Sequence, residues 1–294
     1  MTGARHFFVA ALLAFALAVS GTQTEAQAAG SAVRLTPAVV EAGSPELIRV
    51  TIPEASSVEG EWLGRKFVFF RRGGNWFVLG GVDVEAPVGE STLHITVDVS
   101  GRSVDLSRSV MVHAAHYRTG SLSVAPKFVE PPPEAIKEIE EESKLKATVF
   151  ASSAPEPLWS GDFRAPVKAE ATDSFGTRRM FNGKLASIHK GADFRAATGT
   201  PVHASNSGVV VLARHLYFEG NCVIVDHGMG LFTESLHFSR IDVKEGQHVK
   251  TGDLLGLSGA TGRVTGPHLH WAVRWQGAYL DPLKLLKLDL EDAH

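Results

Sequence analysis

The segment GPHLHWAVRW, residues 266–275, alternates apolar and polar side chains with a period of two. Leu269, Trp271, Val273 and Trp275 fall on one parity, and His268, His270, Ala272 and Arg274 fall on the other. Because successive side chains of a β-strand point to opposite faces, this period is typical of a half-buried strand. The segment therefore predicts a strand that buries one face and presents two neighbouring imidazoles on the other.

Strand-like segments also fill two long regions of the chain. Residues 30–115 contain β-branched and aromatic runs at 46–52, 66–70, 75–84, 91–99 and 107–114, separated by Gly, Pro and Ser. This spacing favours an immunoglobulin-like β-sandwich. Residues 160–288 are rich in glycine and contain further strand segments at 209–213, 222–228, 231–239 and 253–259. We expect a mainly β protein whose C-terminal part is a glycine-rich antiparallel sheet.

The stretch EPPPEAIKEIEEESKLKA, residues 130–147, separates these regions and differs from both. A proline before Glu134 favours a helix start, and a glutamate in the first turn complements the helix dipole. Only Ile136 and Ile139 give an apolar stripe. The pattern predicts a solvated, acidic linker helix.

The first residues have the pattern of a secretory signal peptide. Arg5 precedes an apolar run of 13 residues at 7–19, and AQA at 26–28 fits a cleavage site after Ala28. The run is shorter than the roughly 20 apolar residues of a spanning helix. We therefore expect an exported protein, either of the periplasm or cell envelope or secreted, with no membrane span in the mature chain. The single cysteine, Cys222, excludes an internal disulfide and fits a buried strand position.

A net charge of −3 gives no indication of nucleic-acid binding. Several histidines instead indicate a metal site. In IHKGADFRA, His189 and Asp193 lie four residues apart around Gly191, a pattern of a loop that enters a strand rather than of a helix. A nitrogen and an oxygen ligand suit Zn²⁺, whose catalytic sites usually have three protein ligands.

One histidine of HLH would complete this set, although the strand period does not say which one. His237 lies on another alternating strand, LFTESLHFS, on the same parity as Thr233 and Ser235, and we expect this face to be polar. The remaining HLH histidine and His237 would lie beside the metal without binding it. Because zinc lowers the pKa of a bound water to about 7 and polarises a carbonyl, the expected reaction is amide hydrolysis.

Taken together, four segments resemble the catalytic domain of lysostaphin-type (LytM-type) zinc metallopeptidases over residues 189–283. They are HKGADF with GTPVHASNSGVVV, GNCVIVDHGMGLFTESLHFS, VKEGQHVKTGDLLGLSGATGRVTGPHLHWAV, and DPLKLL. The resemblance implies an open groove and one Zn²⁺ per chain, held by His189, Asp193 and His270. It implies that His237 and His268 are catalytic and that the substrate is a peptidoglycan peptide.

Two further residues are candidate substrate contacts. Asn182, in DSFGTRRMFNG, resembles a contact at the edge of the groove, and Arg274 shares the parity of the strand histidines and could meet a substrate carboxylate. Ser235 and Phe238 depart from the family pattern, and we expect them to alter substrate contacts. DSFGTRRMFNG and KFVEPPPE are similar to segments of bacterial envelope members, which favours a D-alanyl–diaminopimelate cross-link over a Gly-Gly bridge as the scissile bond.

The expected organisation is a signal peptide at 1–28, a β-sandwich domain at 29–118, a linker with a short acidic helix at 119–158, a zinc peptidase domain at 159–288 and a tail at 289–294. The β domain and linker could cover or position the groove. A non-catalytic wall-binding or amidase-regulating module is the main alternative. The presence of a zinc-binding residue at each of the three ligand positions argues against it. A lipoyl-type carrier lacks the required lysine between methionines. Nothing in the sequence indicates an oligomeric state.

Overall fold

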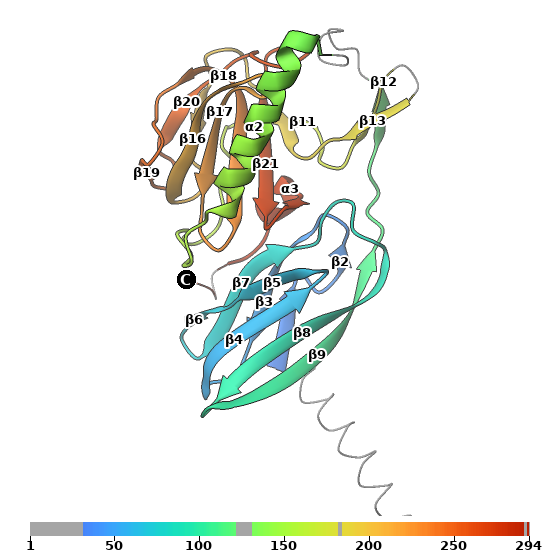
Figure 1. The fold of residues 1–294 in the computed structure, drawn as a ribbon, viewed down its shortest axis with the longest axis vertical. Helices are drawn as coiled ribbons and strands as arrows, with labels where there is room; N and C mark the ends of the chain where they lie inside the picture. The colour runs from blue at the N-terminus through green and yellow to red at the C-terminus, as the bar shows by residue number, and fades with distance from the viewer. Residues whose placement is uncertain (1–31, 122–130, 182–183, 291–292, 294) are drawn as a thin grey trace, which may run out of the picture.

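The structure is a computed structural model that describes residues 32–121, 131–181, 184–290 and 293. The protein is mainly β, as predicted (Figure 1). The predicted signal peptide lies outside the described residues. Among those that are described, no helix combines the length and the apolar character needed to cross a membrane.

Two sheets form the N-terminal part of the protein. One contains β1 (Val33–Thr36), β3 (Pro45–Val50), β7 (Asn75–Gly81) and β6 (Phe70–Arg72) in that order. The other contains β2 (Val40–Glu41), β9 (Arg102–His113), β8 (Gly89–Val99), β4 (Ala55–Trp62) and β5 (Arg65–Val68). Four of the five expected strand segments are confirmed; the fifth, 66–70, is divided between β5 and β6 of different sheets, and β4 was not expected. The immunoglobulin-like assignment and the domain boundaries stay predictions.

A ten-stranded sheet forms the C-terminal part. Its main path is β11 (Ala171–Asp173), β14 (Ala192–Phe194), β21 (Leu269–Trp275), β18 (Leu231–Ile241), β17 (Gly220–Asp226), β16 (Gly208–Leu216) and β19 (His248–Val249). Off this path lie β15 (Pro201–His203), β20 (Leu254–Ser258) and β22 (Ala278–Leu280), and the short helix α3 (Pro282–Leu285) follows β22. A separate small sheet contains β10 (Thr119–Ser121), β12 (Arg178–Phe181) and β13 (Lys184–Ile188).

The alternation of β21 is confirmed, and its apolar face connects the two parts of the protein. Leu269, Trp271 and Val273 are fully buried. The Trp275 indole packs against Phe67 of β5 at a ring-centroid distance of 5.5 Å. A Cβ at Gly80 of β7 would lie 2.7 Å from the same indole, so glycine is required for this close approach. The N-terminal sheets are therefore packed directly against the strand that carries His270.

Helix α2 (Pro133–Ala151) is not the solvated linker that the sequence predicted. It lies across the C-terminal sheet in front of β16, β17 and β18 (Figure 1). Leu145, Val149 and Phe150 pack against an apolar cluster of strand residues: Leu212, Leu216, Cys222, Ile224, Phe232 and Leu236. The sequence argument considered only the apolar residues at the start of the helix, whereas the packing residues are in its last two turns.

His227 lies in the turn between β17 and β18, and its buried ring stabilises this turn through two hydrogen bonds. Its Nδ1 lies 2.7 Å from the Ser207 carbonyl oxygen, and its Nε2 lies 2.9 Å from the Thr233 hydroxyl. The ring is fully buried, and burial lowers the pKa of His227 from 6.5 to about 4. The native protein therefore keeps this imidazole neutral at pH values where the unfolded chain protonates it.

This difference in pKa predicts a loss of stability in mild acid. Below pH 6.5 the unfolded chain binds a proton that the native state accepts only near pH 4. From this linkage, His227 should remove about 2 kcal/mol of unfolding free energy between pH 7 and pH 5. A His227→Gln variant should show a correspondingly weaker decline in that interval, measured by urea unfolding. Equal declines in the two proteins would contradict the assignment.

Candidate metal centre

The register of two strands brings Asp193 and His270 together. β14 and β21 are antiparallel, and Asp193 lies directly opposite His270. Directly opposed residues point to the same face of a sheet, so the carboxylate and the imidazole meet. The distance from Asp193 Oδ1 to His270 Nδ1 is 2.8 Å. As the sequence indicated, the His189–Asp193 segment is a loop that runs into a strand.

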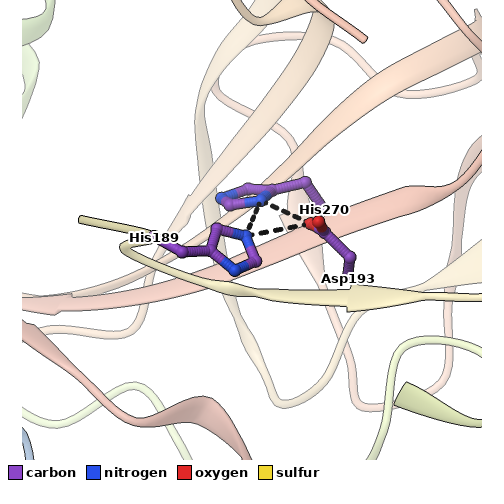
Figure 2. A group of neighbouring side chains, drawn as sticks. All are labelled: His189, Asp193 and His270. Atoms are coloured by element: carbon purple, nitrogen blue, oxygen red, sulfur yellow. Dashed lines mark hydrogen bonds and ion pairs between the residues drawn. The ribbon is translucent and has the colours of Figure 1, made fainter. Parts of the chain in front are cut away.

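His189, in the turn after β13, completes the group (Figure 2). Its Nε2 lies 3.0 Å from Asp193 Oδ1 and 3.0 Å from His270 Nδ1. In a tetrahedral zinc site with bonds of 2.0–2.1 Å, two ligand atoms are about 3.3 Å apart. The spacing of these three atoms is close to that value, and the three residues could hold a metal ion.

The hydrogen bonds of the His189 ring favour a cation at the centre of the group. Its Nδ1 lies 3.1 Å from the Ser174 carbonyl oxygen, which requires a proton on Nδ1. A neutral ring then has a lone pair on Nε2, directed at the Asp193 carboxylate. Two such electron-rich atoms repel one another at 3.0 Å unless a proton or a metal ion lies between them. Burial raises the pKa of Asp193, but hydrogen bonds and charge from the two imidazoles outweigh it and hold that pKa well below its usual range, as they do when the rings carry that proton.

Arg179 and Asp173 support this group, and the sequence analysis did not identify either residue. Arg179 Nη2 donates to Asp193 Oδ2 and to Asp173 Oδ2, at 2.9 Å in both cases. Asp173 Oδ2 also lies 3.4 Å from His189 Nδ1. These contacts orient two of the three candidate ligands, as outer-shell partners do in metal sites. Both residues lie in the segment DSFGTRRMFNG, but their contact with Asp193 depends on the arrangement of β11, β12 and β14.

The other two histidines of the predicted site lie beside the candidate ligands. His237 and His268 have ring centroids 4.9 Å apart, and His268 Nε2 is 3.7 Å from Asp193 Oδ1. His237 Nδ1 lies 2.8 Å from the Thr261 carbonyl oxygen, and His268 Nδ1 lies 2.8 Å from that of Gly266. Each Nδ1 therefore donates its proton to a carbonyl, which leaves Nε2 of the neutral ring able to accept one. Burial and the neighbouring imidazoles lower the pKa of His237 to about 3.

The strand period predicted one open polar face of β18 with Thr233, Ser235 and His237, and of these three only His237 reaches the cleft. Leu236 is paired with His270, so Leu236 is the residue that a regular strand would direct toward the metal site. Thr233 and Ser235, which share the parity of His237, are buried instead of forming an open polar face. His237 has a φ of +69°, and this left-handed conformation breaks the alternation. As a result, Leu236 and His237 both line the cavity beside His270.

Two cavities of about 420 and 430 Å³ meet at the candidate metal site, and we call them together the cleft. Arg179, Ser187, His237, Arg263 and His270 line both of them. The first continues along Thr265, Gly266, Pro267 and His268. The second continues toward α2 along Lys146, Glu219, Glu234 and Tyr279. The cleft therefore extends to both sides of the candidate metal site.

The remaining sequence candidates lie away from this centre. Arg274 lines neither cavity, and its guanidinium lies 3.9 Å over the ring of Phe150 in α2. Ser235 and Phe238 are buried and line neither cavity, so their expected effect on substrate contacts has no direct basis here. Asn182 lies outside the described residues.

Comparisons with known proteins place the site in a recognised sequence family. Residues 187–282 match Peptidase family M23. The chain is 44% identical to peptidoglycan DD-endopeptidase ShyA of Vibrio cholerae over 124 residues, which are 41% of this chain and 29% of that protein. It is 39% identical to the DD-carboxypeptidase/endopeptidase Mpg of Neisseria meningitidis over 98 residues, which are 33% of this chain and 23% of that protein. The chain thus spans less than a third of the length of these curated relatives.

A solved structure is similar over much more of the chain. The crystal structure assigned to peptidase M23 from Pseudomonas aeruginosa aligns with a TM-score of 0.65 and 28% sequence identity. The alignment covers 84% of this chain and 94% of that one. The similarity therefore includes the N-terminal part of the protein as well as the residues of the site.

Gly191 offers a test of the candidate metal centre that leaves every candidate ligand in place. A Cβ at this position would lie 2.5 Å from His270 Nε2 and 2.7 Å from the Trp271 carbonyl oxygen. Gly191→Ala should therefore displace His270 and weaken zinc binding about tenfold or more, by analogy with losses of outer-shell support. Calorimetric titration with Zn²⁺ would measure the affinity.

Gly74→Ala is the matched control, because a Cβ there meets nothing within 4 Å. It should bind zinc as the unchanged protein does, and circular dichroism should show that both variants are folded. Unaltered zinc affinity in folded Gly191→Ala protein would refute a role for His270 in metal binding.

Proposed function

Because residues 187–282 form a domain of peptidase family M23, a family of metallopeptidases, we propose that this chain is an exported zinc-dependent endopeptidase that hydrolyses peptide stems or cross-links of peptidoglycan. The observation that carries the proposal is the convergence of His189, Asp193 and His270 at the middle of a cleft. A cleft open on both sides of the reaction site suits cleavage within a peptide rather than at its end.

One Zn²⁺ per chain would be held by His189, Asp193 and His270. Zinc bound there would supply a polarised carbonyl and a water of lowered pKa. His237 and His268 assist in catalysis because each has an Nε2 free to accept a proton. The carbonyls of Thr261 and Gly266 keep these rings in the required tautomer.

The proposed substrate is supported by the names of the similar proteins and by the signal-peptide pattern at the N-terminus. ShyA is named a peptidoglycan DD-endopeptidase, which supports a D-alanyl–diaminopimelate cross-link as the scissile bond, with a Gly-Gly bridge as the alternative. The signal-peptide pattern at residues 1–28 supports export to the periplasm or cell envelope, where this substrate lies.

Substitution of each HLH histidine should separate metal binding from catalysis. His270→Ala should lose both zinc and activity, because it removes a ligand. His268→Ala should keep about one zinc per chain and lose activity by a factor of about 10² to 10⁴, the usual contribution of a positioned acid or base. Elemental analysis and hydrolysis of cross-linked muropeptides would measure the two properties. Full activity in His268→Ala, or full zinc content in His270→Ala, would show that the roles are assigned wrongly.

The scissile bond can be identified from the products of a defined sacculus. We expect mass spectrometry to show cross-linked dimers converted to monomers that end in D-alanine, with the glycan strands intact. A His189→Ala protein should leave the dimers unchanged. A zinc-free protein that cuts no peptide would instead support the regulatory-module alternative.

A further inference from the structure

Two carboxylates lie in the arm of the cleft nearest α2, and the proposed mechanism uses neither. Glu219 and Glu234, which we call the acidic pair, line the same cavity as His237 and His270. Glu234 is only 5% exposed; its carboxyl group is hydrogen-bonded to Tyr279, but its Oε1 has no hydrogen-bond partner in the described part of the chain. A buried carboxylate oxygen without a partner is costly, so its presence at a cavity wall indicates a group that binds there.

The sheet register places Glu234 on the same face as the metal site. Glu234 lies opposite Ala272, and Leu236 lies opposite His270, two positions further along β21. Residues two apart on a strand share a face, so Glu234 and His270 both point into the cleft. The acidic pair is therefore in position to contact a peptide whose scissile bond lies at the metal site.

A cation from the same chain already occupies this arm of the cleft. Lys146 of α2 forms an ion pair with Glu219, and the two side chains are 28% and 14% exposed. Lys146 also lowers the pKa of Glu234, although burial outweighs it and raises that pKa to about 7. Arg274 also lowers the pKa of Glu234, and Arg263 of the same cavity interacts with Glu219, but neither forms an ion pair with the acidic pair in the described residues. Arg179 and Lys190 are paired elsewhere, with Asp173 and Asp193 and with Glu85, respectively.

The rest of α2 holds Lys146 in this place. Both carboxylate oxygens of Glu142 accept the Tyr217 backbone N–H, at 3.0 Å each. The Phe150 ring meets that of Phe232 edge-on, at a centroid distance of 5.2 Å. Phe232 is paired with Arg274 on the face that also carries Glu234 and His270. Helix α2 thus lies on the substrate-facing side of the sheet and delivers an ammonium group to the acidic pair.

We propose that the acidic pair is a subsite for the side-chain ammonium of a diamino acid in the peptide substrate, and that Lys146 occupies this subsite until such a group displaces it. The inference rests on the proposed function, because it takes the cleft to bind a peptide. Lys146 and a diamino-acid side chain both present a primary ammonium, so either can pair with the same carboxylates; in diaminopimelate this ammonium lies next to a carboxylate, which the lysine side chain lacks. Because of this competition, the apparent affinity for substrate equals the intrinsic affinity multiplied by the fraction of molecules in which Lys146 has left the subsite.

The test compares peptide binding rather than turnover. The probes are an uncross-linked tetrapeptide stem with a free diaminopimelate ammonium and the same peptide with that amine acetylated. The proteins are the full mature chain and its Lys146→Met and Lys144→Met variants. Lys144 is a matched control because it lies on the same helix and is exposed. Calorimetry measures both affinities for each protein, and circular dichroism checks that the helix is retained.

Lys146→Met should bind the free-amine peptide about tenfold more tightly than the unchanged protein, within the usual range for a hydrogen bond to a charged group. The acetylated peptide should show no such gain, and Lys144→Met should behave as the unchanged protein. Adding Glu219→Gln to Lys146→Met should abolish the preference for the free amine. Equal gains for both peptides, no gain, or the same gain in Lys144→Met would overturn the proposal.

Failure of this inference is distinguishable from failure of the proposed function. Cross-link hydrolysis and zinc content are measured on the unchanged protein and do not depend on Lys146. A protein that cleaves cross-links but binds both peptides equally refutes the subsite alone. A protein that binds the free amine selectively but cleaves nothing refutes the enzymatic function and leaves the subsite standing.

Discussion

The pairing of Asp193 with His270 across β14 and β21 is the contact on which the candidate site depends. It fixes two of the three candidate ligands at 2.8 Å from one another by backbone hydrogen bonding rather than by side-chain choice. His189 joins them through a short turn, and Arg179 with Asp173 restrains the group from outside. A shift of the register by one residue would turn His270 to the other face and remove the site.

The strength of this register comes from the opposite face of β21. Leu269, Trp271, Val273 and Trp275 are all buried there, and Trp275 packs against Phe67 of the N-terminal sheets. Burial of these large side chains strongly favours one register over its neighbours. The N-terminal sheets therefore support the site at a distance, although none of their residues is a candidate ligand. On the open face, α2 lies over the same sheet and borders one arm of the cleft through Lys146.

Much of the fold could be predicted from local patterns. The longer alternating segments of both regions and the alternation of β21 are where the sequence placed them, because period two reports which side chains are buried. β4 was not expected, and the segment 66–70 is divided between β5 and β6. The prediction of a solvated linker helix was wrong. Leu145, Val149 and Phe150 pack on the sheet. The helix contains few apolar residues, so its sequence does not show this packing, and the partner surface on the sheet does. His237 lines the cleft, but the open polar face expected for Thr233 and Ser235 was wrong, because the alternation does not reveal the left-handed φ of His237.

The sequence by itself determined which residues had the chemistry of a site: an HxxxD segment, an HxH strand and one further strand histidine. In a regular strand such as β21, local spacing specifies the face on which a side chain lies, since that depends only on neighbouring residues. It does not specify which distant side chains meet, since that depends on strand order and register. Only the tertiary structure brought His189, Asp193 and His270 within 3.0 Å of one another, and only it placed Lys146 against Glu219 in the cleft.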